Sequence, residues 1–197
     1  LGNFLFIHHY VTEKTESELK RSLDRMQHQL SFDELTGVYN RRGGMSRLKE
    51  EFARARRHGR TIAIAMADID KFKNINDTYG HLKGDDILKE IAQKVVSQLR
   101  TMDIYARYGG EEFIICLPET MAHDAVIVAE RIRNIVEECK FKDNDHLITV
   151  TISLGIASLT DIDEELEIII KHADEALYRA KQSGRNGVFF YRANGYS

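Results

Sequence analysis

Two pairs of acidic residues lie at the ends of apolar segments. Carboxylates at such positions are accessible to a ligand and can take part in chemistry. The first pair is in Gly109-Gly110-Glu111-Glu112, which lies between the short apolar runs 103–106 and 113–117. Gly-Gly tolerates positive φ at both positions and is a two-residue hairpin signal, so we expect a hairpin over 103–117 with both glutamates at or beside its tip. Glycines there also let a ligand approach the backbone closely. The pattern indicates a site for a metal ion or a phosphate.

The second acidic pair ends an apolar run. Residues 61–70 are mostly apolar or small and finish in Asp68-Ile69-Asp70. Such a run predicts a strand buried on both faces over 61–69, and the spacing places both aspartates on one face if the strand continues. Mg²⁺ prefers carboxylate oxygens and keeps room for substrate phosphates. A strand-end Asp and a hairpin Glu therefore predict a ligand set for nucleotide-bound Mg²⁺, while Asp70 is either a ligand or a cap of the next turn.

Five segments, taken in order, resemble the GGDEF domain, which is the catalytic domain of diguanylate cyclases. They are DELTGVYNRR at 33–42, DIDKFKNIND at 68–77, GHLKGD at 80–85, GGEEF at 109–113 and AKQSGRN at 180–186. The resemblance spans about residues 31–191. It implies an enzyme that condenses two GTP into cyclic di-GMP and releases two pyrophosphates.

The order of apolar patterns predicts an α+β fold, with helices over a mostly antiparallel sheet. The resemblance implies that this sheet is palm-like, similar to ferredoxin-like nucleotidyl cyclases, and that it is flanked by helices and preceded by an N-terminal linker helix. We expect helices over 40–58, 83–100, 121–139 and 163–182, strands over 61–69, 147–158 and 187–191, the hairpin over 103–117, and a loop carrying Phe72 and Asn76.

The chain is predicted to have three parts. Residues 1–30 are interpreted as the end of an upstream PAS-like sensor strand and a signalling helix, residues 31–192 as the GGDEF domain, and residues 193–197 as a tail. Apolar residues spaced 4, 3 and 4 apart form a short coiled-coil seam in the first part, which favours a dimerising linker; they are Leu19, Leu23, Met26 and Leu30. The alternative is an ordinary amphipathic helix that packs on its own domain.

The resemblance implies that Asp68, the Ile69 carbonyl and Glu111 hold two Mg²⁺ ions per active site, with Mn²⁺ as an alternative. Glu111 is also the candidate general base for the attacking 3′-hydroxyl. Two metals can clamp the attacking and leaving oxygens of such a displacement. Glu112 either assists the metals or holds the hairpin, so the predicted catalytic residues are Glu111 and Glu112.

Guanine recognition needs both acceptors and donors, which Asp and Asn supply. Asn76 and Asp85 match the family's guanine-reading positions, and Asp85 favours GTP in both roles because a related subgroup that makes mixed cyclic dinucleotides carries Ser there. Asp85 is also a candidate cap for a helix that begins at Asp86. Further GTP-binding candidates are the Gly109 and Gly110 backbone, the Phe72 backbone, the Lys73 amine, His81, Lys181 and Arg185.

Several of these candidates have a second interpretation. Phe72 is also a candidate core residue, and His81 a structural neighbour of the loop. Lys181 and Arg185 are the candidates for the terminal phosphates, because they flank a Gly expected just after the last helix. The alternative for Lys181 is that it only offsets the helix dipole.

Arg100 and Asp103 form an RxxD pair before the GGEEF segment, at the spacing where many diguanylate cyclases carry an inhibitory product site. The resemblance adds Arg131 from the neighbouring helix, and it implies cyclic di-GMP as an allosteric inhibitor. Arg binds guanine O6 and N7 or phosphate, and Asp accepts from guanine nitrogens. The alternative is a surface ion pair worth ~0–1 kcal/mol.

The composition limits the partners. A net charge of −3 and a pI of about 6.3 provide no basic footprint for nucleic acid, which disfavours a template-directed polymerase. The two cysteines predict free thiols in a reducing cytosol, and no apolar stretch reaches the ~20 residues of a membrane span. We expect a cytoplasmic domain of a protein that is soluble or membrane-anchored.

Assembly and rival functions complete the expectations. One family domain holds one GTP, so the cyclic product requires a homodimer. The rival functions are a non-catalytic sensor of GTP or cyclic di-GMP, and a mixed cyclase that also uses ATP.

Overall fold

The computed structural model describes residues 18, 20, 30–143, 146–159 and 165–192. The predicted sensor strand, most of the coiled-coil seam and the tail lie outside these residues. The named elements are α2 (Arg41–His58), β1 (Ile62–Ile69), α3 (Phe72–Tyr79), α4 (His81–Val96), β2 (Ile104–Arg107), β3 (Glu112–Pro118), α5 (Ala122–Glu137), β4 (Phe141–Asp143), β5 (His146–Ile148), β6 (Ile152–Ser158), α6 (Leu166–Gln182) and β7 (Val188–Phe190).

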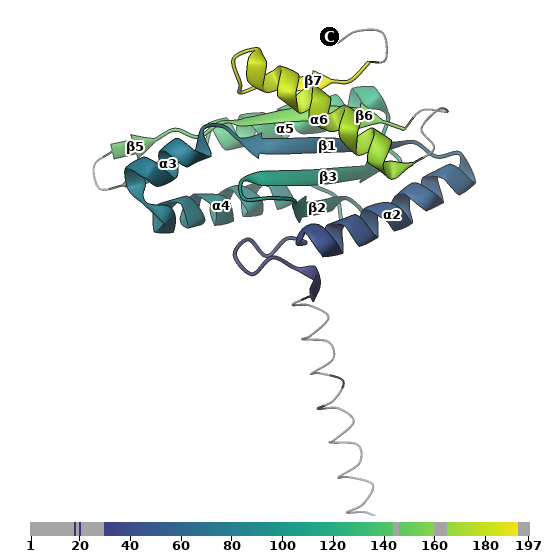
Figure 1. Ribbon diagram of the computed structural model, residues 1–197, viewed down its shortest axis with the longest axis horizontal. Helices are drawn as coiled ribbons and strands as arrows, with labels where there is room; N and C mark the ends of the chain where they lie inside the picture. Colours follow the sequence, from purple (N-terminus) through teal and green to yellow (C-terminus); the bar gives the residue numbers. More distant parts are fainter. Residues whose placement is uncertain (1–17, 19, 21–29, 144–145, 160–164, 193–197) are drawn as a thin grey trace, which may run out of the picture.

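A five-stranded sheet in the order β2-β3-β1-β6-β7 forms the centre of the fold (Figure 1). Its strands pair antiparallel except for β6 and β7, which are parallel. Helices α2 and α6 cover one face of the sheet, and α4 and α5 cover the other. The predicted α+β fold with a mostly antiparallel sheet is confirmed.

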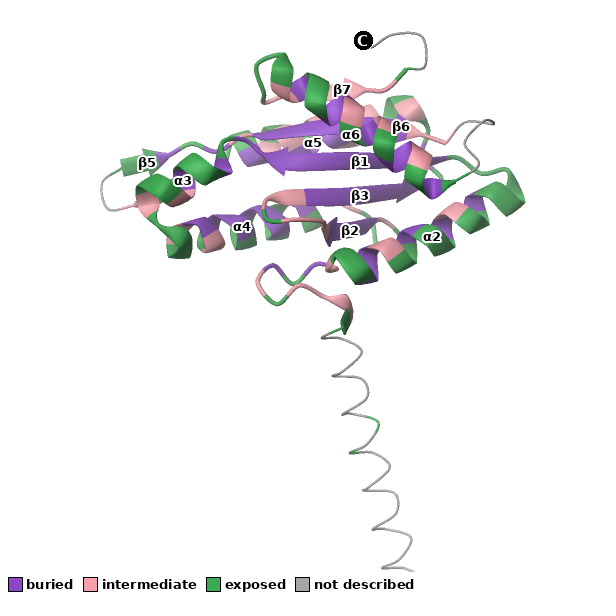
Figure 2. Cartoon of the chain, in the orientation of Figure 1, coloured by how far each residue is buried: buried purple, intermediate pink, exposed green. Residues whose placement is uncertain are grey.

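Strand β1 is buried along its whole length, as its apolar run predicts (Figure 2). Ile64 and Met66 pack with α2 and α6, whereas Ala65 and Ala67 belong to the core on the α4 and α5 side. Because β1 lies between β3 and β6, the position of its carboxyl end is fixed from both sides. Asp68 is therefore presented from a strand that is paired on both edges. In the described part of the chain, no helix is both long and apolar enough to cross a membrane.

Helix α6 packs on β6 at Gly155 without space for a side chain. A Cβ at Gly155 would lie 1.9 Å from the Leu177 nitrogen and 2.2 Å from the Ala173 oxygen. Both atoms are helix backbone, so relief would require the whole helix to move. This close contact sets the height of α6, and thus of Lys181 near its end, above the sheet.

Gly155→Ala is expected to lower the free energy of unfolding by about 3 kcal/mol, since overpacking against backbone cannot relax through a side chain. Urea unfolding of the variant and wild type measures this change. Gly187→Ala is the matched control, because a Cβ there meets its nearest atom at an ordinary 3.5 Å. Equal urea midpoints for Gly155→Ala and wild type would contradict the packing argument.

Three predicted boundaries are wrong. The segment carrying Phe72 and Asn76 is helix α3 and not a loop, because Phe72 and Ile75 form a short buried face. Helix α4 begins at His81, earlier than the predicted residue 83, because Gly80 with φ of 83° joins the two helices directly. Its end at Val96 also precedes the predicted residue 100.

The predicted strand over 147–158 is two strands. β5 pairs with β4 in a separate two-stranded sheet, and β6 begins only at Ile152. Between them, the Thr151 carbonyl accepts from the Asp70 N–H at 2.9 Å, and the Thr151 hydroxyl donates to the Asp70 carboxylate at 2.7 Å. These contacts with the turn after β1 replace a continuous strand.

Candidate active site

The two acidic pairs lie side by side at one end of the sheet. Asp68 faces Glu112 in the β1–β3 ladder, and the Ile69 N–H donates to the Glu111 carbonyl at 3.3 Å. The end of β1 and the β2–β3 turn are at the left of Figure 1, close to α3. The antiparallel register thus brings together carboxylates that are about forty positions apart in the sequence.

The β2–β3 hairpin exists, but its turn differs from the predicted one. Residues 108–111 connect the strands, and neither Gly109 nor Gly110 has a positive φ. The expected two-residue turn with left-handed glycines is therefore wrong. The Gly109 backbone lies close to the Glu112 side chain, since a Cβ there would be 2.5 Å from the Glu112 Oε2 atom. Gly110 faces open space, where a ligand can approach the backbone.

Asp68 is a buried carboxylate in a field of negative charge. It is 8% exposed, and the Lys181 Nζ lies 2.8 Å from its Oδ2 atom. Burial raises the pKa of Asp68 above its ordinary value; the Lys181 amine opposes this rise, and the charges of Glu111 and Glu112 add to it. Three carboxylates and one amine at this point leave an excess of negative charge that favours binding of a cation.

The donor set suits a hard divalent cation. Carboxylate oxygens of Asp68 and Glu111, with the Ile69 carbonyl beside them, are the ligand type that Mg²⁺ and Mn²⁺ take. Among the described residues, no three His, Cys, Asp or Glu side chains form a ready-made metal cage. In nucleotide-bound Mg²⁺ sites, a few carboxylates are usually completed by phosphate oxygens.

Asp70 does not cap helix α3, and both of its carboxylate oxygens are used in structural hydrogen bonds. Its Oδ1 atom accepts from the Ser153 hydroxyl at 2.7 Å. Its Oδ2 atom accepts from the Thr151 hydroxyl at 2.7 Å and from the Asn186 N–H at 3.0 Å. With three donors and 6% exposure, this carboxylate joins the end of β1 to β6 and to the α6–β7 loop.

The two candidate guanine-reading residues are neighbours. Asn76 lies in α3 and Asp85 in α4, and these helices meet where a Cβ on Gly84 would lie 1.9 Å from the Asn76 Oδ1 atom. Asp85 is inside α4, so its interpretation as a helix cap is wrong. Both side chains are partly exposed, which is the accessibility that a base-reading pair requires.

The remaining predicted GTP-binding residues surround this end of the sheet. Phe72 is 6% exposed and its side chain packs in the core. Only its backbone, at the start of α3, is therefore a candidate for contact with a nucleotide. Lys73 and His81 are exposed at the starts of α3 and α4. Arg185 is exposed just after α6, where its N–H donates to the Ala180 carbonyl at 3.1 Å. That bond and Gly184, with φ of 114°, form the predicted glycine-ended helix terminus.

The family pattern described as "Diguanylate cyclase, GGDEF domain" matches residues 30–187. The chain belongs to the GGDEF family. Response regulator PleD of Caulobacter vibrioides is 39% identical over 184 residues, which are 89% of this chain and 40% of that protein. Diguanylate cyclase DosC of Escherichia coli is 42% identical over 168 residues, which are 85% of this chain and 36% of that protein. This GGDEF domain therefore spans less than half the length of these relatives.

Solved GGDEF structures share the fold. The coiled coil and GGDEF domain of DgcB from Caulobacter crescentus, in complex with c-di-GMP, superpose with a TM-score of 0.88 at 30% identity, covering 94% of this chain and 98% of that one. The active GGEEF domain of a diguanylate cyclase from Vibrio cholerae gives a TM-score of 0.74 at 37% identity, covering 78% of this chain and 97% of that one. The predicted membership and palm-like fold are confirmed.

Arg107 is a residue of this GGDEF domain that the sequence interpretation missed. Its Nε and Nη2 atoms donate to the Gly110 carbonyl at 3.0 and 2.8 Å, and its Nη1 atom donates to Asp33 at 3.2 Å. One guanidinium therefore joins the turn bearing Glu111 to the segment just before α2. The available signal was an arginine directly before Tyr-Gly-Gly, where a planar fork of donors suits turn carbonyls.

Asp33 is held in place for this contact. It accepts from the Thr36 N–H at 2.9 Å and from the Thr36 hydroxyl at 2.7 Å. Burial opposes ionisation, but the hydrogen bonds from Thr36 and the charge of Arg107 outweigh it and hold the pKa of Asp33 below its ordinary value. Asp33 therefore remains charged, and paired with Arg107, at neutral pH.

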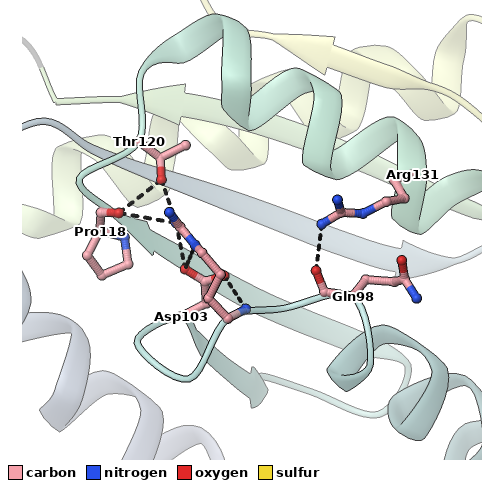
Figure 3. A network of polar contacts seen from close by, with 6 residues as sticks. Gln98, Asp103, Pro118, Thr120 and Arg131 are labelled. Atoms are coloured by element: carbon pink, nitrogen blue, oxygen red, sulfur yellow. Dashed lines mark hydrogen bonds and ion pairs between the residues drawn. The ribbon is translucent and has the colours of Figure 1, made fainter.

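The RxxD pair forms a closed network at the other end of the hairpin (Figure 3). Arg100 donates to Asp103 at 2.8 Å and to the Thr120 hydroxyl at 2.7 Å. The Asp103 side chain is only 2% exposed, whereas that of Arg100 is 50% exposed. Arg131 extends from α5 and donates to the Gln98 carbonyl at 2.6 Å. The guanidinium groups, and not the carboxylate, are therefore the accessible part of this candidate product site.

Proposed function

We propose that this GGDEF domain is a diguanylate cyclase that condenses two GTP into cyclic di-GMP and two pyrophosphates. The observation that carries the proposal is the adjacency of Asp68, Glu111 and Glu112 at the end of β1, in a chain of the GGDEF family. The carboxylates are intact at every position where the resemblance places catalytic acids. A sensor that had lost activity would have no need to keep them.

Glu111 is proposed as the general base that removes the proton of the 3′-hydroxyl. The hydroxyl oxygen then attacks the α-phosphorus of the other GTP, the new P–O bond forms, and the bond to pyrophosphate breaks. Asp68, Glu111 and the Ile69 carbonyl would hold the divalent cations, two Mg²⁺ or Mn²⁺, which supply Lewis acidity for the attacking and leaving oxygens when bound. The Glu112 side chain packs against the Gly109 backbone, and Glu112 is proposed to shape the turn.

Asn76 and Asp85 are proposed to read guanine from α3 and α4. Their donors and acceptors match its edge, and a base that leaves such polar groups unpaired is strongly disfavoured. Phosphates would extend from there toward the start of α3, with Lys73, and toward Lys181 and Arg185 at the end of α6. The proposed substrate is GTP in both halves of the reaction, and His81 is a neighbour of this site.

The cyclic product requires two attacks, so two domains must face one another in a homodimer. The Asn40 side chain donates to the Leu30 carbonyl at 3.1 Å and to the Phe32 carbonyl at 3.2 Å, which joins the start of α2 to the end of the preceding helical segment. We propose that the linker in residues 1–30 sets the distance between the two domains, under control of a sensor domain in the same polypeptide.

Incubation with GTP and Mg²⁺, followed by chromatography, is expected to yield cyclic di-GMP. Specific activity should rise with enzyme concentration, because the active species is a dimer. ATP is expected neither to replace GTP nor to form mixed cyclic products. Guanine-nucleotide binding without product would support the sensor function instead.

We propose that cyclic di-GMP also inhibits the domain through Arg100 and Arg131, with Asp103 orienting Arg100. Arg131 lines a hollow of about 560 Å³ on the α5 side, whereas Arg100 and Asp103 line a separate hollow of about 350 Å³. Two arginines bind phosphates and guanine edges in a bidentate way. The site and the catalytic acids are at opposite ends of β3, so this inhibition would act at a distance from the chemistry.

Arg100→Ala is expected to raise the concentration of cyclic di-GMP for half-inhibition by about tenfold or more, since a charged hydrogen-bonding group is lost. Initial rates measured across added product test this. Arg47→Ala on the outer face of α2 is the control and should keep the wild-type inhibition curve. If both variants and wild type are inhibited equally, the product site lies elsewhere.

A further inference from the structure

The loop between α6 and β7 has left-handed backbone at two consecutive residues that are not glycine. Arg185 and Asn186 are consecutive, neither is glycine, and their φ angles are 67° and 44°. Asn tolerates left-handed backbone, but at Arg185 it costs about 1 kcal/mol or more and persists only where the surroundings impose it. The Arg185 N–H bond to the Ala180 carbonyl holds one side of this backbone, and the contacts of Asn186 hold the other.

Asn186 is bound from the sheet side by Asp70. Its backbone N–H donates to the Asp70 Oδ2 atom at 3.0 Å. The Asp70 carboxylate is fixed by the hydroxyls of Thr151 and Ser153, both at 2.7 Å. Because Asp70 follows Asp68 by two residues, this bond ties the loop to the strand end that presents the candidate cation ligand.

Asn186 is bound from the helix side by α5. Its Oδ1 atom accepts from the Arg133 Nη1 atom at 2.9 Å, and its Nδ2 atom donates to the Glu137 Oε1 atom at 2.8 Å. Arg133 also bonds Glu137 at 2.7 Å and Glu130 at 2.8 Å. Both ends of the amide are therefore used, and their order is fixed because Glu137 only accepts and Arg133 only donates.

We propose that Asn186 is a positioning residue for triphosphate recognition, which rests on the proposed function. By fixing the backbone at 186 between Asp70 and α5, it holds the adjacent Arg185 at a set place relative to Asp68. A guanidinium held there meets the terminal phosphates of a nucleotide whose cation lies on Asp68. Asn186 thus determines the preference for a triphosphate over a monophosphate without touching the nucleotide.

Asn186→Asp tests this with a nearly isosteric change. The new carboxylate still accepts from Arg133, but it cannot donate to Glu137 and the two acids repel each other, so the loop loses its hydrogen bond to Glu137. Adding Glu137→Gln restores a donor opposite the new acceptor and reverses the hydrogen bond. This double variant keeps the size of every side chain and separates loop position from loss of atoms.

The measurement compares dissociation constants of two unreactive probes, α,β-methylene-GTP and GMP, in Mg²⁺. Wild type is expected to prefer the triphosphate analogue. Asn186→Asp should reduce this preference about tenfold, the effect of losing one charged hydrogen-bonding contact, with GMP affinity unchanged. Arg185→Ala should give the same loss, and Arg185→Ala combined with Asn186→Asp should lose no more than either alone. The variant that also carries Glu137→Gln should recover most of the preference.

Three results would overturn the inference. In the first, Asn186→Asp keeps the wild-type preference while Arg185→Ala loses it, which leaves the proposed function intact. In the second, Asn186→Asp weakens the binding of both probes equally and lowers the melting temperature, which would indicate a merely structural role. In the third, wild type shows no preference for the triphosphate, which contradicts the proposed function as well.

Discussion

Glu111→Gln is expected to lower the rate of cyclic di-GMP formation by about 10³-fold or more. The amide has the same size but can neither accept the 3′-hydroxyl proton nor bind a cation as a carboxylate does, and general-base loss alone is worth about 10²–10⁴-fold. The structural contact of this residue with Ile69 uses its backbone carbonyl, so the fold should be unaffected. Initial rates at saturating GTP, with circular dichroism for folding, provide the measurement.

Two matched variants sharpen this test. Glu50→Gln, in an exposed ion pair on α2, should change the rate less than twofold. Glu112→Gln separates the two roles that the sequence left open for the second acid. Loss of a metal ligand would raise the Mg²⁺ concentration needed for activity, whereas loss of a turn contact would lower activity at every Mg²⁺ concentration. If Glu111→Gln kept a tenth of the wild-type rate, the base would have to be another group.

Arg107→Met is expected to lower kcat by about 100-fold, because a catalytic group displaced by about 1 Å costs a factor of that order. The methionine keeps the aliphatic contacts of the side chain but releases the Gly110 carbonyl, which Arg107 holds through two hydrogen bonds. The turn that bears Glu111 then loses its link to Asp33. GTP affinity should change little, so the effect should appear in kcat and not in KM.

A double-mutant cycle with Asp33→Asn tests whether the two residues act together. The combined variant should be no less active than Arg107→Met alone, since both changes break one connection. Arg107→Lys should not restore activity, because a point charge cannot bond the carbonyl and the carboxylate as the planar fork does. Additive losses would mean that Asp33 and Arg107 affect the turn independently.

The sequence predicted the parts of this domain that depend on strong local patterns. The buried strand β1, the amphipathic helices α2, α5 and α6, and the hairpin bearing Glu111 follow from periodicity and turn residues. The adjacency of Asp68 and Glu111 followed from the resemblance and from both acids being at segment ends. The register that faces Asp68 with Glu112 is a long-range property that only the assembled sheet shows.

The sequence did not predict features that depend on tertiary contacts. Helix α3 is too short for its periodicity to stand out, and it packs closely on α4 at Gly84. The glycines of the hairpin predicted a left-handed turn, but neither has a positive φ in the folded domain. Asp70 was left open between a ligand and a cap, and Arg107 had no assigned role, whereas each bonds segments that are far apart in the chain.

The most direct test of the central claim is a crystal structure of the domain with α,β-methylene-GTP and Mn²⁺, with the anomalous signal used to locate the metal. We predict Mn²⁺ bound by the carboxylates of Asp68 and Glu111 and by the nucleotide phosphates, with guanine against Asn76 and Asp85. Manganese bound to the phosphates without either carboxylate, or a nucleotide seated away from the end of β1, would contradict the account.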